Sequence, residues 1–314
     1  MMTKTVAIPR NLAQAGKDYL TQHGMTLVEL DDMSTATIAQ QAKEVDGIVL
    51  MTDPFGNELA DQMPNLKVIA RHGVGYDNVD QDFWGQQGVW VTITPNANAA
   101  TVAETALAEM LDLSKDLTGQ STAMRRGDGQ YKVTHLGFDL AGKSLGIMGF
   151  GRIGRALGKL VQSLNMRVLI YDPFVQQTDL GELVDRDTLL RESDVISLHM
   201  AVTPENKQGI GEREFAMMKD SAYLVNLGRG ALVDQAALIA ALKAHTIAGA
   251  ALDVFDEEPL PLNSPFFSLD NALLTPHIAS NTREAMDRMA VDSASEVVRV
   301  LQGQTPQWAV NQVQ

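Results

Sequence analysis

The chain has 314 residues, of which 45% are hydrophobic and 20% charged, as expected for a folded globular protein. This length exceeds that of one typical domain and predicts two domains, each with its own core. The 25 basic and 39 acidic side chains give a net charge of −14, which disfavours binding to nucleic acid or to an anionic membrane surface.

The chain has no cysteine, which excludes disulfides, thiolate metal sites and a cysteine nucleophile. We expect no metal site. The N-terminal segment Met1 to Pro9 has too few apolar residues for a signal sequence, and no run approaches the ~20 residues that span a bilayer. These features predict a cytoplasmic protein without a membrane segment.

The first 95 residues alternate between strand-like and helix-like runs. The expected strands lie at 5–8, 26–30, 47–51 and 66–70, and the expected helices at 12–23 and 34–44. The runs at 47–51 and 66–70 are continuously apolar, which is typical of parallel strands covered on both faces. This part of the chain is therefore predicted to form one α/β unit.

Two loops of this unit are candidate ligand loops. The segment Arg71 to Asp77 follows a strand directly, and its two glycines expose backbone N–H groups that could hold a carboxylate. A glycine turn without a ligand is the alternative. The loop at 52–57 carries Phe55, which indicates either an apolar side-chain pocket or an exposed aromatic residue. Thr94 to Glu104 then enters a long helix, where the chain can cross between domains.

Ser144 to Gly154 is an apolar run that ends in glycines spaced G-x-G-x-x-G. Such glycines allow a tight turn, close approach of a pyrophosphate to backbone amides, and packing of the following helix on the sheet. The next apolar run ends on Asp172, where a ribose-binding carboxylate is expected. A glycine turn in another βαβ unit is the alternative, but this context favours a dinucleotide site. The predicted contacts are Gly149, Phe150, Gly151, Arg152, Ile153, Gly154 and Asp172.

Later strand-like runs at 194–199, 223–226, 247–253 and 272–275 end on polar or glycine-rich segments, which would form the ligand crevice of a parallel sheet. Arg229, between glycines, can clamp a carboxylate and a carbonyl oxygen. His277 can deliver or remove a proton, and Glu258 can fix its tautomer. Singly, each could be an ordinary surface or loop residue. The competing histidines are His23, His72, His135, His199 and His245.

These motifs, in this order, resemble the D-isomer-specific 2-hydroxyacid dehydrogenase family. The resemblance rests on the glycine motif with Asp172, on Asn226 to Gly230, on Asp253 to Pro259 and on Thr275 to His277, and the loop at 71–80 and the helix at 98–104 extend it. It implies an α/β fold of two parallel-sheet domains, Rossmann-like or flavodoxin-like, with a cleft between them. The substrate-binding domain would comprise 1–98 and 285–314, the NAD-binding Rossmann domain 99–284, and the protein would be a homodimer.

The resemblance also implies roles for individual residues. His277 would be the proton donor and acceptor, Glu258 its partner and Arg229 the substrate clamp. The implied substrate-binding residues are His72, Val74, Gly75, Asn98 and Phe55, with the amides of Val74 and Gly75 holding the carboxylate. Further implied cofactor-binding residues are His199, Thr203, Asn226 and Asp253. No arginine follows Asp172 at 173–176 to meet a 2′-phosphate, so NAD is favoured over NADP.

The expected reaction is hydride transfer between NAD(H) and C2 of a D-2-hydroxy or 2-oxo acid. Members that act on phosphoglycerate, hydroxypyruvate or glyoxylate are the alternatives. The loop at 52–57 lacks basic residues, which disfavours a phosphorylated substrate, although Arg71, His72 or a partner subunit could supply charge. Formate dehydrogenases share this fold and the histidine, but they resemble a pattern with glutamine where this chain has Glu258. This difference disfavours a formate dehydrogenase. An NAD(H)-sensing corepressor is the alternative from another functional class.

Overall fold

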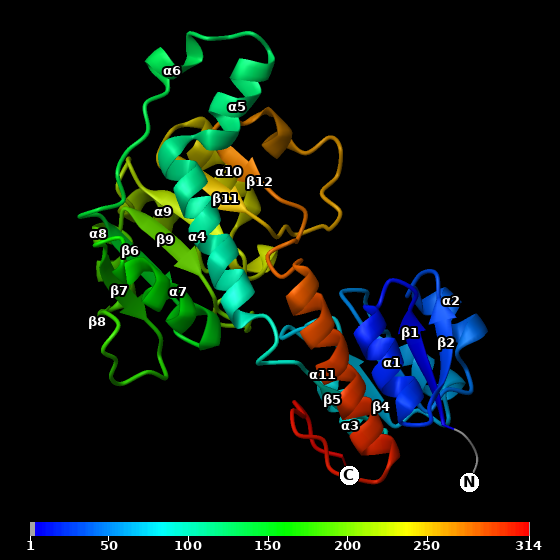
Figure 1. The fold of residues 1–314 in the computed structure, drawn as a ribbon. Helices are drawn as coiled ribbons and strands as arrows, with labels where there is room; N and C mark the ends of the chain where they lie inside the picture. Colours follow the sequence, from blue (N-terminus) through cyan, green and yellow to red (C-terminus); the bar gives the residue numbers. More distant parts are fainter. Residues whose placement is uncertain (1–3, 314) are drawn as a thin grey trace. The chain divides into compact units, whose positions relative to one another are not determined.

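The computed structural model describes residues 4–313, and the chain divides into two compact units. The first unit contains the chain up to Asn98 and again from Asn281, drawn in blue and red in Figure 1. The second unit is Ala99–Ser280. Residues 1–3 of the N-terminal segment considered above lie outside the described residues. Within residues 4–313, no helix combines the length and apolar character that crossing a membrane requires.

The first unit is built on a five-stranded parallel sheet with the order β2-β1-β3-β4-β5. Its strands are β1 (Thr5–Pro9), β2 (Thr26–Leu30), β3 (Gly47–Leu50), β4 (Val68–Arg71) and β5 (Trp90–Thr92). The chain adds β2 on one side of β1 and then returns to the other side with β3, which is the flavodoxin-like order. The predicted strands are confirmed, and only the three-residue β5 was missed.

Helices cover both faces of this sheet. They are α1 (Gln14–Gln22), α2 (Thr35–Gln41), α3 (Gln81–Gln86) and α11 (Arg283–Leu301), with the short 3₁₀ helix η1 (Asn57–Gln62). The paired helices α1 and α11 bury one face through side chains such as Leu20, Ala290 and Val297. The Ser34 hydroxyl caps α2 by accepting a hydrogen bond from the Thr37 N–H.

Phe55 contradicts one of the two sequence interpretations of the loop at 52–57, that of an exposed aromatic residue. Its side chain is 3% exposed and belongs to the second core of this unit, where its ring centroid lies 5.1 Å from that of Trp84. The loop turns back onto the sheet because the Phe55 N–H donates to the carbonyl oxygen of Asn78, 2.9 Å away. Phe55 is therefore not an exposed aromatic residue, and its contact with a substrate stays a prediction.

The second unit is built on a seven-stranded parallel sheet with the order β12-β11-β10-β9-β6-β7-β8. Its strands are β6 (Ser144–Met148), β7 (Arg167–Tyr171), β8 (Glu182–Leu183), β9 (Val195–Leu198), β10 (Tyr223–Asn226), β11 (Gly249–Leu252) and β12 (Ala272–Leu274). The direction of strand addition reverses between β6 and β9. Ligands of open α/β sheets bind at such a switch point, beyond the carboxyl ends of the strands.

Two layers of helix enclose this sheet. Its helices are α4 (Ala99–Lys115), α5 (Leu117–Arg125), α6 (Tyr131–Thr134), α7 (Arg152–Gln162), α8 (Arg186–Glu192), α9 (Glu212–Met217) and α10 (Gln235–Lys243), with the 3₁₀ helices η2 (Gly230–Leu232) and η3 (Pro265–Ser268). Side chains of α4 and α7 contribute to one core, and those of α8, α9 and α10 to the other. The stretch 127–142, between α5 and β6, contains the one-turn helix α6.

Candidate active site

The glycine turn after β6 has the geometry that a dinucleotide requires. Gly149 has a φ of +90°, and a Cβ there would lie 2.7 Å from the carbonyl carbon of His199, which follows β9. A Cβ on Gly154 would collide with the Gly149 carbonyl oxygen. In contrast, a Cβ on Gly151 would meet nothing within 4 Å. The turn is therefore tightly packed on both sides but open above Gly151, where the backbone is accessible to a phosphate.

Asp172 braces this turn from the end of β7. Its Oδ2 accepts a hydrogen bond from the Phe150 N–H at 2.7 Å, and its Oδ1 accepts one from the Phe174 N–H at 2.8 Å. The side chain is half-buried. Each carboxylate oxygen can accept more than one hydrogen bond, so Asp172 retains capacity for ribose hydroxyls. The residues present fit NAD, and no arginine at 173–176 offers a partner for a 2′-phosphate.

The four remaining predicted cofactor residues follow three strands of the same sheet. His199 Nε2 lies 2.9 Å from the Ser197 hydroxyl, and burial lowers the pKa of His199 to about 4, so this ring is neutral at pH 7. The exposed Thr203 begins a turn in which its N–H donates to Asn206 Oδ1. Asn226 and Asp253 are buried and hold neighbouring loops, as described below. Their contact with a cofactor stays a prediction.

The His277 and Glu258 side chains meet in the second unit. His277 Nδ1 lies 2.6 Å from Glu258 Oε2, and the two side chains are 32% and 33% exposed. Glu258 Oε1 also accepts a hydrogen bond from the Phe255 N–H at 3.0 Å. His277 has a φ of +54°, and its N–H donates to the Asp253 carbonyl oxygen at 2.8 Å. Since Nδ1 faces the carboxylate, Nε2 is the ring nitrogen that can face a ligand.

Arg229 belongs to the same group of side chains. Burial raises the pKa of Glu258, but the His277 hydrogen bond, the charges of His277 and Arg229, and the Phe255 N–H outweigh burial and hold this pKa below its ordinary value. The Arg229 guanidinium is thus close enough to act on Glu258. Asn226 shapes this loop, because its Nδ2 donates to the Arg229 carbonyl oxygen at 2.9 Å and its Oδ1 accepts from the Gly228 N–H at 3.1 Å.

The loops that carry Arg229 and Glu258 touch through their backbones. A Cβ on Gly230 would collide with the Phe255 carbonyl group. Glycine is therefore required at position 230, because no side chain fits between the two segments. The relative placement of the guanidinium and the carboxylate depends on this main-chain contact.

A buried carboxylate holds the loop that carries His277. Asp253 is fully buried, and its Oδ1 and Oδ2 accept hydrogen bonds from the N–H groups of Ile278 and Ala279, both at 2.7 Å. The Thr275 hydroxyl donates to Oδ1 at 2.6 Å. The sequence analysis included Thr275 in a family motif but assigned no role to it or to these two amides. The sequence pattern around these residues is a weak signal, since the same residues would suit an ordinary loop.

In the first unit, a buried cation organises the predicted carboxylate-binding loop. Arg71 is 3% exposed, and its guanidinium donates to the carbonyl oxygens of Leu50 at 2.7 Å and Gly75 at 3.0 Å. The N–H groups of Val74 and Gly75 donate to no group within the described chain, and both residues are half-buried. Arg71 therefore gathers carbonyl oxygens and leaves amide donors for a ligand. This role was not predicted from the sequence.

Two further predicted substrate residues of this unit are buried. His72 is 8% exposed, its Nε2 has no partner among residues 4–313, and burial lowers its pKa to about 4. Asn98 is 7% exposed, and its Oδ1 likewise has no partner within the described part of the chain. Both carry unsatisfied polar atoms, but a role in substrate binding stays a prediction.

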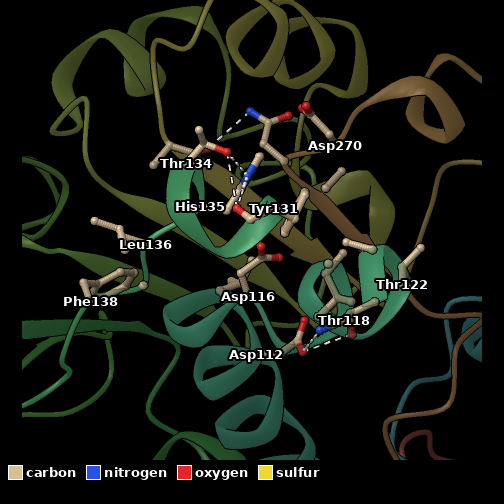
Figure 2. A pocket seen from close by; sticks show the side chains of 18 of the residues that line it. Asp112, Asp116, Thr118, Thr122, Tyr131, Thr134, His135, Leu136, Phe138 and Asp270 are labelled. Carbon is tan, nitrogen blue, oxygen red and sulfur yellow. Dashed lines mark hydrogen bonds between the residues drawn. The ribbon is translucent and has the colours of Figure 1, made fainter. Parts of the chain in front are cut away.

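Among the described residues, His23, His135 and His245 make no hydrogen bond to Glu258. His23 Nδ1 contacts the Tyr19 carbonyl oxygen, and His135 stacks on the Tyr131 ring with centroids 3.6 Å apart. His135 and His245 line a separate cavity of about 650 Å³ beside α5 and α6, shown in Figure 2. Neither the glycine turn nor His277 contributes to its wall.

Comparison with known proteins places this geometry in a family. Residues 107–279 match the NAD-binding domain of D-isomer specific 2-hydroxyacid dehydrogenases. The chain belongs to this family. A glyoxylate reductase from Thermococcus litoralis is 41% identical over 285 residues, which cover 87% of this chain and 86% of that protein. The crystal structure of a glyoxylate reductase from Paecilomyes thermophila matches with a TM-score of 0.87 and 30% identity over 99% of both chains.

A third relative has a different substrate. The D-3-phosphoglycerate dehydrogenase of Archaeoglobus fulgidus is 36% identical over 98% of this chain, which covers 59% of that protein. The predicted family, fold class and NAD dependence are confirmed by these matches. The dehydrogenase transfers a hydride between NAD(H) and C2 of a 2-hydroxy or 2-oxo acid. The roles of individual residues remain to be tested.

Proposed function

We propose that this dehydrogenase reduces a short, unphosphorylated 2-oxo acid with NADH, glyoxylate being the first candidate. The observation that carries the proposal is the 2.6 Å contact between His277 and Glu258, beside Arg229 and in the same unit as the glycine turn. Glyoxylate is suggested by the T. litoralis and P. thermophila relatives.

Three observations argue against a phosphate on the substrate. The loop at 52–57 has no basic residue. The guanidinium of Arg71, a candidate source of charge, is buried and engaged by two backbone carbonyl oxygens. His72, the other candidate, is neutral at pH 7 because burial lowers its pKa to about 4. Within residues 4–98, neither this loop nor Arg71 nor His72 therefore offers a phosphate a free cationic partner, which disfavours a phosphorylated substrate.

We assign each of these groups a separate role in the reduction. NADH, when bound, supplies the hydride that C2 receives. Arg229 polarises the 2-oxo group through its guanidinium, and the N–H groups of Val74 and Gly75 bind the carboxylate. His277, held at Nδ1 by Glu258, donates a proton from Nε2 to the oxygen on C2. Glu258 stabilises the protonated ring and prevents it from turning away.

The test is NADH oxidation with a panel of 2-oxo acids: glyoxylate, pyruvate, hydroxypyruvate, phenylpyruvate, oxaloacetate and 3-phosphohydroxypyruvate. We expect the highest kcat/KM for glyoxylate or hydroxypyruvate, and at least a tenfold lower value for the phosphorylated acid, about 1.4 kcal/mol in transition-state binding. A preference for 3-phosphohydroxypyruvate would overturn the substrate assignment. NADH binding without turnover of any acid would favour the NAD(H)-sensing corepressor.

We also propose that the enzyme is a homodimer. Its second copy would pack on the segment 117–136, which contains α5 and α6 and is called the α5–α6 arm here. This arm exposes large apolar side chains: Leu117 is 57% exposed, Met124 80%, Val133 61% and Leu136 84%. Such a cluster is unusual for a surface exposed to water. Sedimentation should show a dimer that the double change Met124→Asp and Leu136→Asp converts to monomer. The control Leu262→Asp, at a residue 96% exposed, should leave the mass unchanged. A cytoplasmic location stays a prediction.

A further inference from the structure

Helix α4 carries a buried acid that the mechanism does not use. Glu109 is 4% exposed and lies on the core-facing side of α4, next to Met110. Its Oε1 lies 3.2 Å from the Thr275 hydroxyl, and its Oε2 has no partner within the described chain. A buried carboxyl with so few partners is costly when it is ionised, so its protonation state needs an explanation.

The single hydrogen of the Thr275 hydroxyl group determines the protonation state of Glu109. The Thr275 hydroxyl lies 2.6 Å from Asp253 Oδ1 and 3.2 Å from Glu109 Oε1, and it carries one hydrogen. The shorter contact assigns this hydrogen to Asp253, which also accepts the Ile278 and Ala279 amides. Glu109 can then bind Thr275 only as a neutral carboxyl group that donates its own proton to the hydroxyl oxygen.

The surroundings of Glu109 favour the same state. Burial, followed by the negative charge of Asp253, raises the pKa of Glu109 to about 8; the Thr275 contact acts in the opposite direction, and the charge of Asp112 adds a smaller increase. Asp253 follows β11 and Asp112 is on α4 itself, and α7, which packs on α4, has exposed basic side chains only. These are Arg152, Arg155 and Lys159. Glu109 is therefore mostly neutral at pH 7.

We propose that neutral Glu109 is a positioning residue for His277. It donates to Thr275, which donates to Asp253, and Asp253 holds the amides that follow His277. Ionisation of Glu109 removes the first donor and places a second negative charge against Asp253, so the His277 loop loosens. The proposal rests on the proposed role of His277 in proton transfer.

The test compares Glu109→Gln with the native enzyme as a function of pH. Glutamine keeps an N–H donor for Thr275 but does not ionise. The kcat values should be equal at pH 6.5, and at pH 9 the variant should exceed the native enzyme about tenfold, because a group half-ionised near pH 8 is about 90% ionised there. Glu109→Leu, which lacks a donor, should lower kcat roughly 5–50-fold without changing the KM for NADH. Glu192→Gln, an exposed acid of the same unit, is the matched control.

Thermal unfolding gives a second readout that does not require activity. The pKa of Glu109 is higher in the folded chain, so the folded state holds an extra proton between pH 4.5 and 8 and loses stability as pH rises through this window. The native melting temperature should fall relative to that of Glu109→Gln by roughly 5–10 °C from pH 5 to pH 8. Parallel melting curves, or a kcat ratio of one at every pH, would overturn the proposal. An inactive native enzyme would instead refute the proposed function and leave the melting test valid.

Discussion

The loop after β4 in the first unit and the loop after β12 in the second are organised by buried charges of opposite sign. Arg71 donates to the carbonyl oxygens of Leu50 and Gly75, and the N–H groups of Val74 and Gly75 donate to no group within the described residues. Asp253 instead accepts hydrogen bonds from the N–H groups of Ile278 and Ala279, and so holds the loop that carries the His277 imidazole. In our proposal, the loop held by the buried cation binds an anion, and the loop held by the buried anion serves proton transfer. The sign of the buried charge determines which backbone groups it takes up, carbonyl oxygens for Arg71 and N–H groups for Asp253.

The largest expected effect comes from the loop held by the anion. Replacing His277 with alanine removes the proton donor but leaves the Asp253 contacts to the neighbouring amides intact. We expect kcat to fall by about 10²–10⁴-fold, while the Kd for NADH measured by fluorescence stays within about twofold. Turnover close to that of the native enzyme would remove His277 from the mechanism.

A smaller effect is expected from a change of Arg71, the cation that holds the loop after β4. Changing Arg71 to methionine leaves two buried carbonyl oxygens without their charged donor, so the amides of Val74 and Gly75 lose their alignment. The KM for the 2-oxo acid should rise roughly 10–100-fold, with a smaller change in kcat. Lys67→Met, at an exposed position just before the same strand, is the control. Circular dichroism should confirm folding, and an unchanged KM in a folded variant would contradict this role.

Asp172 extends the comparison to the glycine turn, where a half-buried anion gathers the amides of Phe150 and Phe174. Asp172→Asn keeps the size of the side chain and weakens these contacts as well as those to a ribose. We expect the Kd for NADH to rise roughly 3–10-fold, with kcat at saturating NADH nearly unchanged. Equal NADH affinity of the two proteins, measured by titration calorimetry, would show that Asp172 only braces the turn.

Much of this architecture was predictable because it depends on local patterns. Apolar runs identified the strands, and the G-x-G-x-x-G spacing located the turn that Gly149 makes with a φ of +90°. The contact of Glu258 with His277 joins residues 19 positions apart. It was expected through the family resemblance, since spacing alone could not rank His277 above His199. The pKa of about 4 for His199, which argues against a role as proton donor, depends on burial that only the fold provides.

The residues that were misjudged depend on contacts between distant segments. An exposed loop position was one of two interpretations of Phe55, but the hydrogen bond to Asn78 holds that loop against the core around Trp84. Glu109 passed unnoticed inside an apolar helix. Its spacing of three residues from Ala106, which places it on the buried face, was the available signal. Its link to Asp253 passes through Thr275, which lies 166 residues away, and no local pattern reports such a partner.

The absence of room for a side chain at Gly230 has a practical consequence for engineering. A mutant library meant to broaden the range of acids accepted can randomise exposed residues of the first unit, while the buried Arg71 and the core side chains stay unchanged. It should keep codon 230 invariant, because even alanine would push the guanidinium-bearing segment away from its carboxylate neighbour. Loss of catalysis in such a clone would then report a displaced main chain and not an altered preference for the acid.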